Sequence, residues 1–460
     1  MATAITAPTY DPIPTATSLA DKYVAARQQI LTSQSAAATA ADKALTELNS
    51  ALSAFQTSLS ALTGLNKTMY TQAATFGDPT IGSATASSTA AAGAYSFFVE
   101  KLAAASQVSY AGLADATDVS GKLGIEMGGE LAFEVDLGAG ARDLTPRELA
   151  AAINAAEGNG GKVTASVVST GNGASELVLT ARDTGEASAI TLKLDDLSGP
   201  AELTGALDAS RARTVVQAQD AVIHVGGEGG TLIKQANNTF TAIDGVKMTF
   251  TKAQASGAAP VTLTVGPDDK GTSANVQGFV DAFNKLKTVL NKLTDAGDPG
   301  KGVGGGAFAH DAGIRALNDR LTGLLRPGSG DSLASFGIIA TRTGTLELKT
   351  DRLLSQLALK PEGLDALIGS TAAAASTGIA GALDGYLKSW SSSVDGQIKQ
   401  RREQTSALQL RLGDRQATLD QQHEAAYQRY LRQFTQLQTM QGVMNQNVSL
   451  FDALFGNDKN

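Results

Sequence analysis

A lysine beside a run of glycines is the first stretch of this sequence that could bind a ligand. Lys301 precedes the glycine-rich residues 302–306. A phosphate-binding loop needs its lysine, followed by serine or threonine, at the end of the glycines, between a strand and a helix. Here the lysine comes first, and the residues before it have the spacing of a helix. We therefore predict a surface loop without a nucleotide site.

Three histidines are the residues that could bind a metal or act as a base: His224, His310 and His423. Zinc sites place their ligands at short, characteristic spacings, and none of the three has another histidine three or four positions away. His224 lies in an alternating pattern, His310 precedes a helical pattern and His423 lies within one. We interpret all three as structural residues.

Other kinds of catalytic or metal site have little support. The pairs Asp195-Asp196 and Asp268-Asp269 lack the glycine and glutamate of a calcium-binding EF-hand, so we expect surface turns. Cysteine is absent, which excludes disulfides, cysteine–zinc sites and thiol enzymes. No Gly-x-Ser-x-Gly motif occurs. A Ser/His/Asp triad stays open from sequence alone, although no residues point to one. We predict a protein that is not an enzyme and has no cofactor and no metal.

The charge and hydropathy of the sequence argue against nucleic acid as a general partner and against a membrane-spanning segment. The net charge is −8, whereas a general nucleic-acid binder needs a basic face. Between positions 121 and 200 there are 12 acidic and 6 basic residues, which we interpret as a solvated acidic face. No apolar run approaches the roughly 20 residues of a membrane span, and no secretory signal pattern is present. We expect a cytosolic protein or one exported without a cleaved signal.

Two long helices are the elements that the sequence predicts most clearly. Residues 20–62 and 390–455 contain no proline, and small or apolar residues recur there at steps of three and four, the a/d pattern of a coiled coil. Successive four-residue steps near His423 and Tyr430 indicate local unwinding. The predicted seams are Ala20, Val24, Leu31, Ala38, Ala41, Leu45, Leu48, Leu52, Phe55, Leu59 and Leu62, and Val394, Ile398, Thr405, Leu408, Leu412, Leu419, Ala426, Tyr430, Phe434, Leu437, Met444, Val448, Phe451 and Phe455.

Each apolar stripe is one seam wide, so either helix alone would be marginal in water. We therefore predict that the two terminal helices pack together, with the remaining chain folded between them. Before the first helix, residues 1–17 contain Pro8, Pro12 and Pro14, which predict an extended, mobile tail. Ser18 is the predicted helix cap.

The middle of the chain has the alternation of strands. Residues 94–100 are a predicted strand, and residues 83–93, rich in Ala, Ser and Thr, predict a linker. Thr145 and Glu148 form the sequence pattern of a capping box, which predicts a short helix. Three hairpins are predicted, with turns at Gly171-Asn172-Gly173, Asp244-Gly245 and Thr343-Gly344.

Together these patterns predict an α+β multidomain chain, with terminal coiled-coil legs made by the paired N- and C-terminal helices and mostly-β domains inserted between them. The predicted domains are the leg helices 1–45 and 415–460, mobile when free; a helical coiled-coil stem with a small β-hairpin, 46–80 and 268–414; a β-rich middle domain, 81–116 and 201–267; and an inserted β-rich tip, 117–200.

One segment resembles a known family. Residues 331–349, Asp-Ser-Leu-Ala-Ser-Phe-Gly-Ile-Ile-Ala-Thr-Arg-Thr-Gly-Thr-Leu-Glu-Leu-Lys, with Leu353, Leu357 and Pro361 after them, are similar to a segment of the bacterial flagellar filament cap proteins, the flagellar hook-associated protein 2 family. Further stretches with the same resemblance are 306–315, 83–102 and 144–180, and with the long terminal helices they extend it over nearly the whole chain.

The sequence departs from that family at one place. Pro12 and Pro14 stand before the first helix, where family members often have a glycine-rich stretch. This departure concerns how the N-terminal tail is held, and it leaves the resemblance of the other segments intact.

The resemblance implies a homo-oligomer, with a pentamer expected, at the distal end of the growing filament. Legs would point toward the filament, and the middle domains would form a plate that retains exported flagellin and guides it into the lattice. The implied partners are other copies of this chain, flagellin, neighbouring hook-associated proteins and an export chaperone. The implied location is extracellular, at the flagellar tip, after export by the flagellar type III route.

The sequence is also compatible with four other kinds of protein. They are another flagellar axial protein, either flagellin-like or a different hook-associated protein, a secreted coiled-coil adhesin, and a hydrolase on a stalk. Residues 336–349 favour the cap over other axial proteins, and no polar catalytic cluster supports a hydrolase. The residues expected to carry coiled-coil packing and assembly are Leu45, Leu48, Leu52, Phe55, Leu59, Leu62, Ile398, Leu408, Leu412, Leu419, Tyr430, Phe434 and Leu437.

Overall fold

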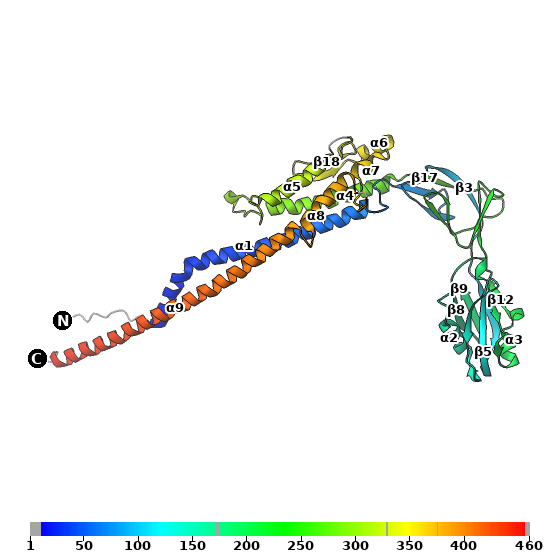
Figure 1. The fold of residues 1–460 in the computed structure, drawn as a ribbon, viewed down its shortest axis with the longest axis horizontal. Helices are drawn as coiled ribbons and strands as arrows, with labels where there is room; N and C mark the ends of the chain where they lie inside the picture. The colour runs from blue at the N-terminus through cyan, green and yellow to red at the C-terminus, as the bar shows by residue number, and fades with distance from the viewer. Residues whose placement is uncertain (1–10, 172–173, 328–329, 375, 456–460) are drawn as a thin grey trace. The chain divides into compact units, whose positions relative to one another are not determined.

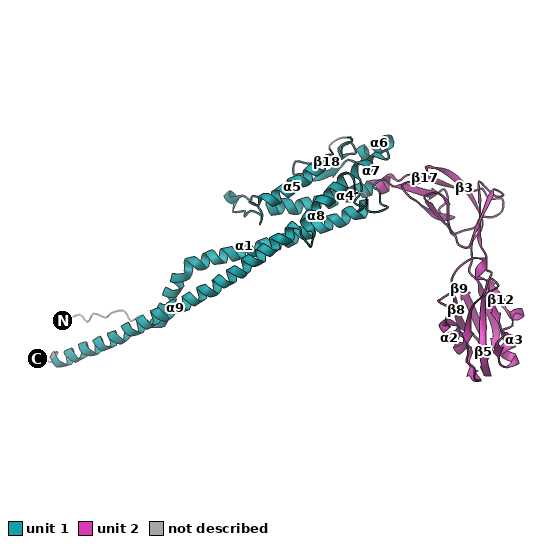
Figure 2. Ribbon diagram, in the orientation of Figure 1, with its two compact units in different colours: residues 1–69, 273–460 teal, residues 70–272 magenta. Residues whose placement is uncertain are grey.

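The chain folds into two compact units. The computed structural model describes residues 11–171, 174–327, 330–374 and 376–455. We call residues 1–69 and 273–460 the stem unit and residues 70–272 the sheet unit (Figure 2). The predicted fold class is confirmed, because the long terminal helices pack together in the stem unit and the middle of the chain is rich in strands.

Two long helices lie side by side in the stem unit, α1 (Pro12–Thr63) and α9 (Gln397–Phe455) (Figure 1). Neither sequence has a proline inside the helix beyond the first turn of α1, so nothing interrupts the backbone hydrogen bonds. Residues at the a and d positions of one helix pack against those of the other. Each helix thus provides the partner that the narrow apolar stripe of the other requires.

The start of α1 differs from the prediction. Asp11, and not Ser18, caps the helix, and the Asp11 Oδ1 accepts a hydrogen bond from the Ile13 backbone N–H at 3.1 Å. Pro12 and Pro14 lie in the first turn, where backbone N–H groups have no intrahelical partner, so the missing donors do no harm. The predicted extended tail is therefore wrong from Pro12 onward, and the first ten residues lie outside the described residues.

Shorter helices and one hairpin complete the stem unit. Phe55 of α1 lies with its ring centroid 6.5 Å from that of Phe279 and 6.0 Å from that of Phe283, which places α4 against α1. Gly344 (φ +76°) lies in the hairpin turn, as predicted. The elements are α4 (Asp269–Thr294), η3 (Pro299–Lys301), α5 (Ala312–Leu324), β18 (Ile338–Ala340), β19 (Leu346–Leu348), α6 (Thr350–Leu359), α7 (Gly363–Ile368) and α8 (Gly378–Ser391).

The sheet unit contains two separate apolar cores. Around the first core, strands pair in the orders β1-β17-β3-β13-β14 and β15-β16-β2, and Phe76, Phe97, Phe240 and Phe250 are buried within it. The predicted turn at Asp244-Gly245 is confirmed. The strands are β1 (Gln72–Phe76), β2 (Gly82–Ala86), β3 (Gly93–Lys101), β13 (Ala221–Val225), β14 (Thr231–Gln235), β15 (Thr239–Ile243), β16 (Val246–Phe250) and β17 (Val261–Pro267).

Strand β2 corrects the predicted linker. It occupies part of residues 83–93, and it pairs antiparallel with β16 from Ser83 opposite Thr249 to Ala86 opposite Val246. Small residues were the reason to expect a linker, but they pair well here because β16 supplies the bulky side chains of this small sheet.

The second core belongs to a segment that we call the insert, residues 105–218. Ala104 and Gln219 form an isolated β-bridge at its base, with N–H to O distances of 2.9 and 3.2 Å. Its sheets have the orders β12-β4-β9-β8 and β10-β5-β11, with β6 and β7 also on β5. The elements are β4 (Gln107–Leu113), β5 (Ala116–Met127), β6 (Glu130–Asp136), β7 (Arg142–Leu144), α2 (Pro146–Ala155), β8 (Val163–Gly171), β9 (Ala174–Ala181), η1 (Glu186–Ser188), β10 (Ile190–Lys193), β11 (Leu197–Ser198), α3 (Ala201–Ala206), η2 (Ala209–Arg211) and β12 (Arg213–Val216).

Two local predictions for the insert are confirmed. Thr145 and Glu148 form the capping box of α2: the Thr145 Oγ1 accepts from the Glu148 N–H, and the Glu148 Oε2 accepts from the Thr145 N–H. Strands β8 and β9 pair as an antiparallel hairpin. Of its predicted turn residues, Asn172 and Gly173 lie outside the described residues.

Candidate assembly surface on the terminal helices

The pairing of α1 with α9 is the feature on which assembly would be built. Polar side chains bridge the two helices at several levels, and the residue number on α9 falls as that on α1 rises, so the helices are antiparallel. Three of these bridges are His423 Nε2 to Asp21 Oδ1 (2.8 Å), the Gln28 and Gln416 amides (3.0 Å in both directions) and Arg402 to Asp42 (3.7 Å).

The seam between the helices is thin where the bridges lie. A small cluster of buried apolar residues joins the helices there: Val24, Leu31, Ala38, Leu412 and Leu419. Alanine at seam positions removes little apolar area from water, so this part of the pair gains little stability from burial. The reciprocal Gln28–Gln416 amide pair buries little apolar area, but its hydrogen bonds are directional. It fixes the register of the two helices because each amide meets its partner at one alignment only.

The residues expected to carry packing and assembly have different environments. Eight of them are buried, three are half-buried and two are exposed. The buried residues are Leu45, Leu48, Leu52, Phe55, Leu59, Ile398, Leu412 and Leu419; the half-buried ones are Leu62, Tyr430 and Phe434; Leu408 and Leu437 are 40% and 42% exposed. The structure thus places most of them between helices of one chain, and any role between chains stays a prediction.

The end of α9 exposes a run of apolar side chains. Pro12 lies nine positions before Asp21, whereas Phe455 lies 32 positions after His423, so α9 continues well past the start of α1. Exposed apolar clusters of this kind usually mark an interaction surface. We call it the α9 end surface, and its members are Leu437, Met440, Val443, Met444, Val448, Leu450 and Leu454.

Arginine side chains that stack on tyrosine rings beside the seam were not predicted. The Arg429 guanidinium lies 5.7 Å from the ring centroid of Tyr23 and 4.8 Å from that of Tyr430, and the Arg27 guanidinium lies 5.5 Å from the Tyr23 ring. Arg27 also donates to the Gln422 Oε1 at 2.7 Å. The sequence signal would have been Tyr23 and Arg429, which stand next to the seam residues Val24 and Tyr430, because residues that flank the seam decide partner choice in coiled coils.

An ion pair fixes the start of α9 to α5. Arg401 donates to both carboxylate oxygens of Asp311, and the Asp311 Oδ1 also accepts from the Ile314 N–H at 2.9 Å as the cap of α5. Burial raises the pKa of Asp311, but the hydrogen bonds and charge from Arg401, together with the backbone donors, outweigh it and hold that pKa below its ordinary value. The pair therefore stays ionised and rigid at neutral pH.

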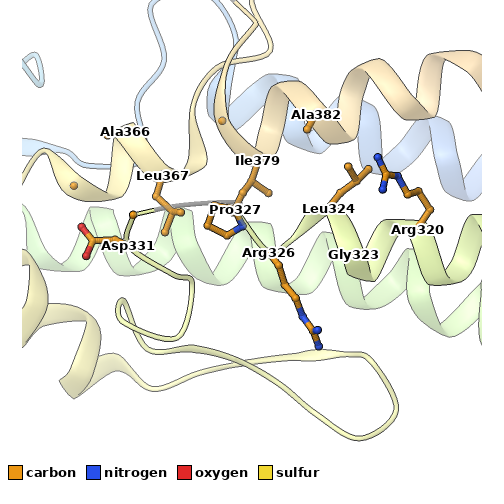
Figure 3. Close-up of a pocket in the computed structure, with 13 residues that line it drawn as sticks. Arg320, Gly323, Leu324, Arg326, Pro327, Asp331, Ala366, Leu367, Ile379 and Ala382 are labelled. Carbon is orange, nitrogen blue, oxygen red and sulfur yellow. The ribbon is translucent and has the colours of Figure 1, made fainter.

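A cavity of about 570 Å³ opens between α5, α7 and α8 (Figure 3). Leu324, Leu367 and Ile379 line it, Arg320 lies at one end, and Asp331 lies near the other. The Asp331 carboxylate is held by Lys360 at 3.2 Å. The described lining contains no histidine, serine or cysteine that could act as a base or nucleophile, so we assign no reaction to it.

The other candidate sites are likewise structural. His224 and His423 each bond a carboxylate, of Glu100 and Asp21, and His310 is exposed on a loop. Lys301 lies in a 3-10 turn and pairs with Asp298 at 3.0 Å rather than closing a phosphate loop. Across the described residues, no three His, Asp or Glu side chains gather where they could hold a metal ion. None of the helices described has the length and apolarity to cross a membrane.

Comparison with known proteins agrees with this architecture. Family models of the flagellar hook-associated protein 2 C-terminus and N-terminus match residues 218–446 and 15–106. The lateral flagellar hook-associated protein 2 of Vibrio parahaemolyticus is 32% identical over 80% of this chain and 82% of its own length. The B-type flagellar hook-associated protein 2 of Pseudomonas aeruginosa is 32% identical over 87% of this chain and 86% of its length. The crystal structure of the D1-D2-D3 domains of the flagellar cap protein FliD from Escherichia coli superposes with a TM-score of 0.60, at 27% identity, over 79% of this chain and 99% of that chain.

Proposed function

Since this chain belongs to the flagellar hook-associated protein 2 family, the family of the flagellar cap proteins, we propose that it caps the distal end of a flagellar filament. It is a structural protein of the flagellum and not an enzyme. As a cap it holds exported flagellin at the filament end and promotes its incorporation.

The α9 end surface is the observation that carries the attachment to the filament. Leu437, Met440 and Met444 are 42%, 69% and 50% exposed on a helix that extends past α1. Covering them removes apolar area from water at about 25 cal/mol per Å². A partner with a helical apolar stripe, such as the end of a filament built from helical subunits, completes the seam that α1 leaves open.

We further propose the partners and the location. The cap is a homo-oligomer, with a pentamer as the expected state, that contacts flagellin and neighbouring hook-associated proteins. Before assembly the exposed α9 end is bound by an export chaperone, because an apolar helix face of this kind aggregates if left uncovered. The chain leaves the cell by the flagellar type III route and works extracellularly at the filament tip. Family membership supports each of these points.

A triple substitution tests the attachment. Leu437→Ala, Met440→Ala and Met444→Ala together remove the apolar surface but keep helix propensity. In a strain whose own copy is deleted, we expect this variant to release flagellin into the medium as monomer and to abolish swimming. The matched control is Gln436→Ala, Gln438→Ala and Gln446→Ala on the same helix, which should swim normally. Normal swimming by the first variant would contradict the proposal.

A further inference from the structure

A histidine in the sheet unit is enclosed on both of its ring nitrogens. His224 of β13 is 9% exposed. Its Nε2 lies 2.8 Å from the Glu100 Oε2, and its Nδ1 lies 3.2 Å from the Gly230 carbonyl oxygen. Both neighbours are acceptors. A neutral imidazole carries one N–H and can donate to one of them, whereas the imidazolium donates to both.

The strand β3 is built to present Glu100 to this ring. Ile223 pairs with Val99 and Val222 with Lys101, so Glu100 is the extra residue of a β-bulge. Bulges re-aim a side chain out of the regular alternation. Here the carboxylate reaches the ring of His224 on the neighbouring strand, while the ring also packs near Phe98, with the centroids 6.3 Å apart.

The Gly230 carbonyl belongs to a turn made almost entirely of glycine. Residues 226–230, Gly-Gly-Glu-Gly-Gly, join β13 to β14, and Gly226, Gly227 and Gly229 have positive φ. Glycine gains more freedom on release than any other residue. One internal hydrogen bond, from the Gly230 N–H to the Gly227 carbonyl at 2.9 Å, holds this turn together with the contacts that other groups make with it, and His224 is one of those groups.

A second carboxylate ties the same turn to the loop between β16 and β17. The Glu228 Oε1 accepts from the Ser256 Oγ at 2.6 Å, and its Oε2 accepts from the Gly257 N–H at 2.6 Å. The charged groups acting on His224 are Glu100 on β3 and Glu228 on the turn. Lys234 on β14 is engaged with Glu186 and Asp220.

We propose that His224 is a proton-operated latch of the sheet unit, which holds the 226–230 turn and the loop at Ser256 in place when the ring is protonated and releases them when it is neutral. In the released state the neutral ring has one nitrogen without a proton, which faces the lone pairs of either the Gly230 carbonyl or the Glu100 carboxylate. The group that faces this nitrogen is repelled and moves away from the ring.

The direction of the pH response follows from the contacts. The hydrogen bond to Glu100, the Gly230 carbonyl and the two negative charges raise the pKa of His224 above its ordinary value of 6.5, against an opposing effect of burial. A group with a raised pKa in the folded state contributes stability below its unfolded pKa and loses that contribution as pH rises through the folded value. The latch is thus closed in mild acid and opens as pH rises above 6.5 through the raised pKa.

The experiment uses the full chain labelled with ¹³C at the histidine ring. The ring signals of His224, His310 and His423 are assigned with single His→Gln variants, and the His224 signal is followed against pH. Hydrogen exchange of the peptide covering the 226–230 turn is measured in parallel and corrected for the intrinsic pH dependence of exchange. The hairpin turn at Asp244-Gly245, which has no histidine, serves as the internal control.

We expect His224 to titrate above 6.5 and the corrected exchange of the 226–230 turn to rise several-fold with the same midpoint, while the control turn stays constant. Glu100→Gln should lower both midpoints together, and His310→Gln should move neither. A His224 midpoint at or below 6.5 would overturn the proposal, as would a turn whose exchange does not follow it.

Discussion

The end of α9 and the insert differ in where their apolar side chains lie: the insert buries them and the end of α9 exposes them. In the insert, Tyr110, Leu123, Ile125, Leu177 and Leu179 are all fully buried in a core made by its own strands. At the end of α9, the apolar residues from Leu437 to Leu454 are 42% exposed or more. The insert buries its apolar residues within its own core, whereas the α9 end leaves its apolar side chains exposed.

Charge divides the two regions as well. Residues 105–218 carry 16 acidic and 8 basic residues, a net charge of −8, which equals the net charge of the whole chain. The remaining 29 acidic and 29 basic residues balance. A net charge keeps the insert soluble and discourages association, and the near-neutral remainder leaves the terminal helices free to associate. The comparison teaches that the acidic region buries its own apolar residues, and that the exposed apolar residues of α9 lie in the part of the chain whose charges balance.

The largest expected effect comes from charging the stem core. Leu52 is fully buried between α1 and its neighbours, and Leu52→Asp places an unpaired carboxylate there at a cost of about 4 kcal/mol or more in the free energy of unfolding. Trp390 of α8 is the one tryptophan in the sequence and is buried in the stem unit, so its fluorescence during urea unfolding reports on that unit. The matched control is Leu410→Asp at a position 73% exposed, which should change little; equal curves for both variants would contradict the assigned core.

A smaller change in the free energy of unfolding, an increase instead of a decrease, is expected on replacing Lys287. Its side chain is 5% exposed and donates to the Asn318 Oδ1 (2.6 Å), the Asn318 carbonyl and the Thr322 Oγ1, which are all neutral acceptors. Burial lowers the pKa of Lys287 from 10.5, against the charge of Asp319. Lys287→Met removes the cost of burying the charge and should raise the free energy of unfolding by about 1 kcal/mol at neutral pH.

The pH dependence of that effect separates it from better packing. Because its pKa is lowered on folding, Lys287 is neutral in the folded state over a pH range where it is still charged in the unfolded state, so stability rises with pH through that range. The Met variant lacks this rise, and its advantage in Trp390-monitored unfolding should shrink toward pH 10.5. Lys285→Met, on the exposed face of the same helix, is the control. A constant advantage at every pH would point to packing instead.

The smallest expected effect comes from removing the insert. Because Ala104 and Gln219 already exchange two backbone hydrogen bonds, residues 105–218 can be replaced by a short Gly/Ser linker. Trp390-monitored unfolding should change by less than about 0.5 kcal/mol, and filament growth should continue if the terminal helices carry the assembly surface, as we propose. A folded stem unit that no longer supports filaments would show that the insert takes part in capping.

The long-range plan of the stem unit was predictable because it depends on a repeated pattern. Steps of three and four residues indicated both terminal helices, and the Thr145–Glu148 pair indicated the start of α2 from four residues alone. Leu408 fits the same steps and yet is exposed, because a straight helix drifts away from a strict seven-residue repeat.

What could not be predicted depends on residues far apart in sequence. The sequence of β2 predicted a linker, because its strand character depends on pairing with β16. The burial of Lys287 likewise depends on Asn318 and Thr322 of another helix. The bulge at Glu100 follows from how β3 meets β13, for which the sequence of β3 carries no sign. Pairwise packing of this kind decides sheets and polar networks more than local propensity does.

The bridge between Ala104 and Gln219 bears on the order in which the sheet unit folds. Strands β3 and β13 are neighbours in the first core, but the whole insert separates them along the chain. In an unfolded chain, bringing them together closes a long loop and has a corresponding entropic cost. If the insert folds first, its own contacts bring positions 104 and 219 together, and the effective loop shrinks to a few residues. Early folding of the insert then acts as a template that speeds the pairing of β3 with β13, in the way that low contact order speeds folding generally.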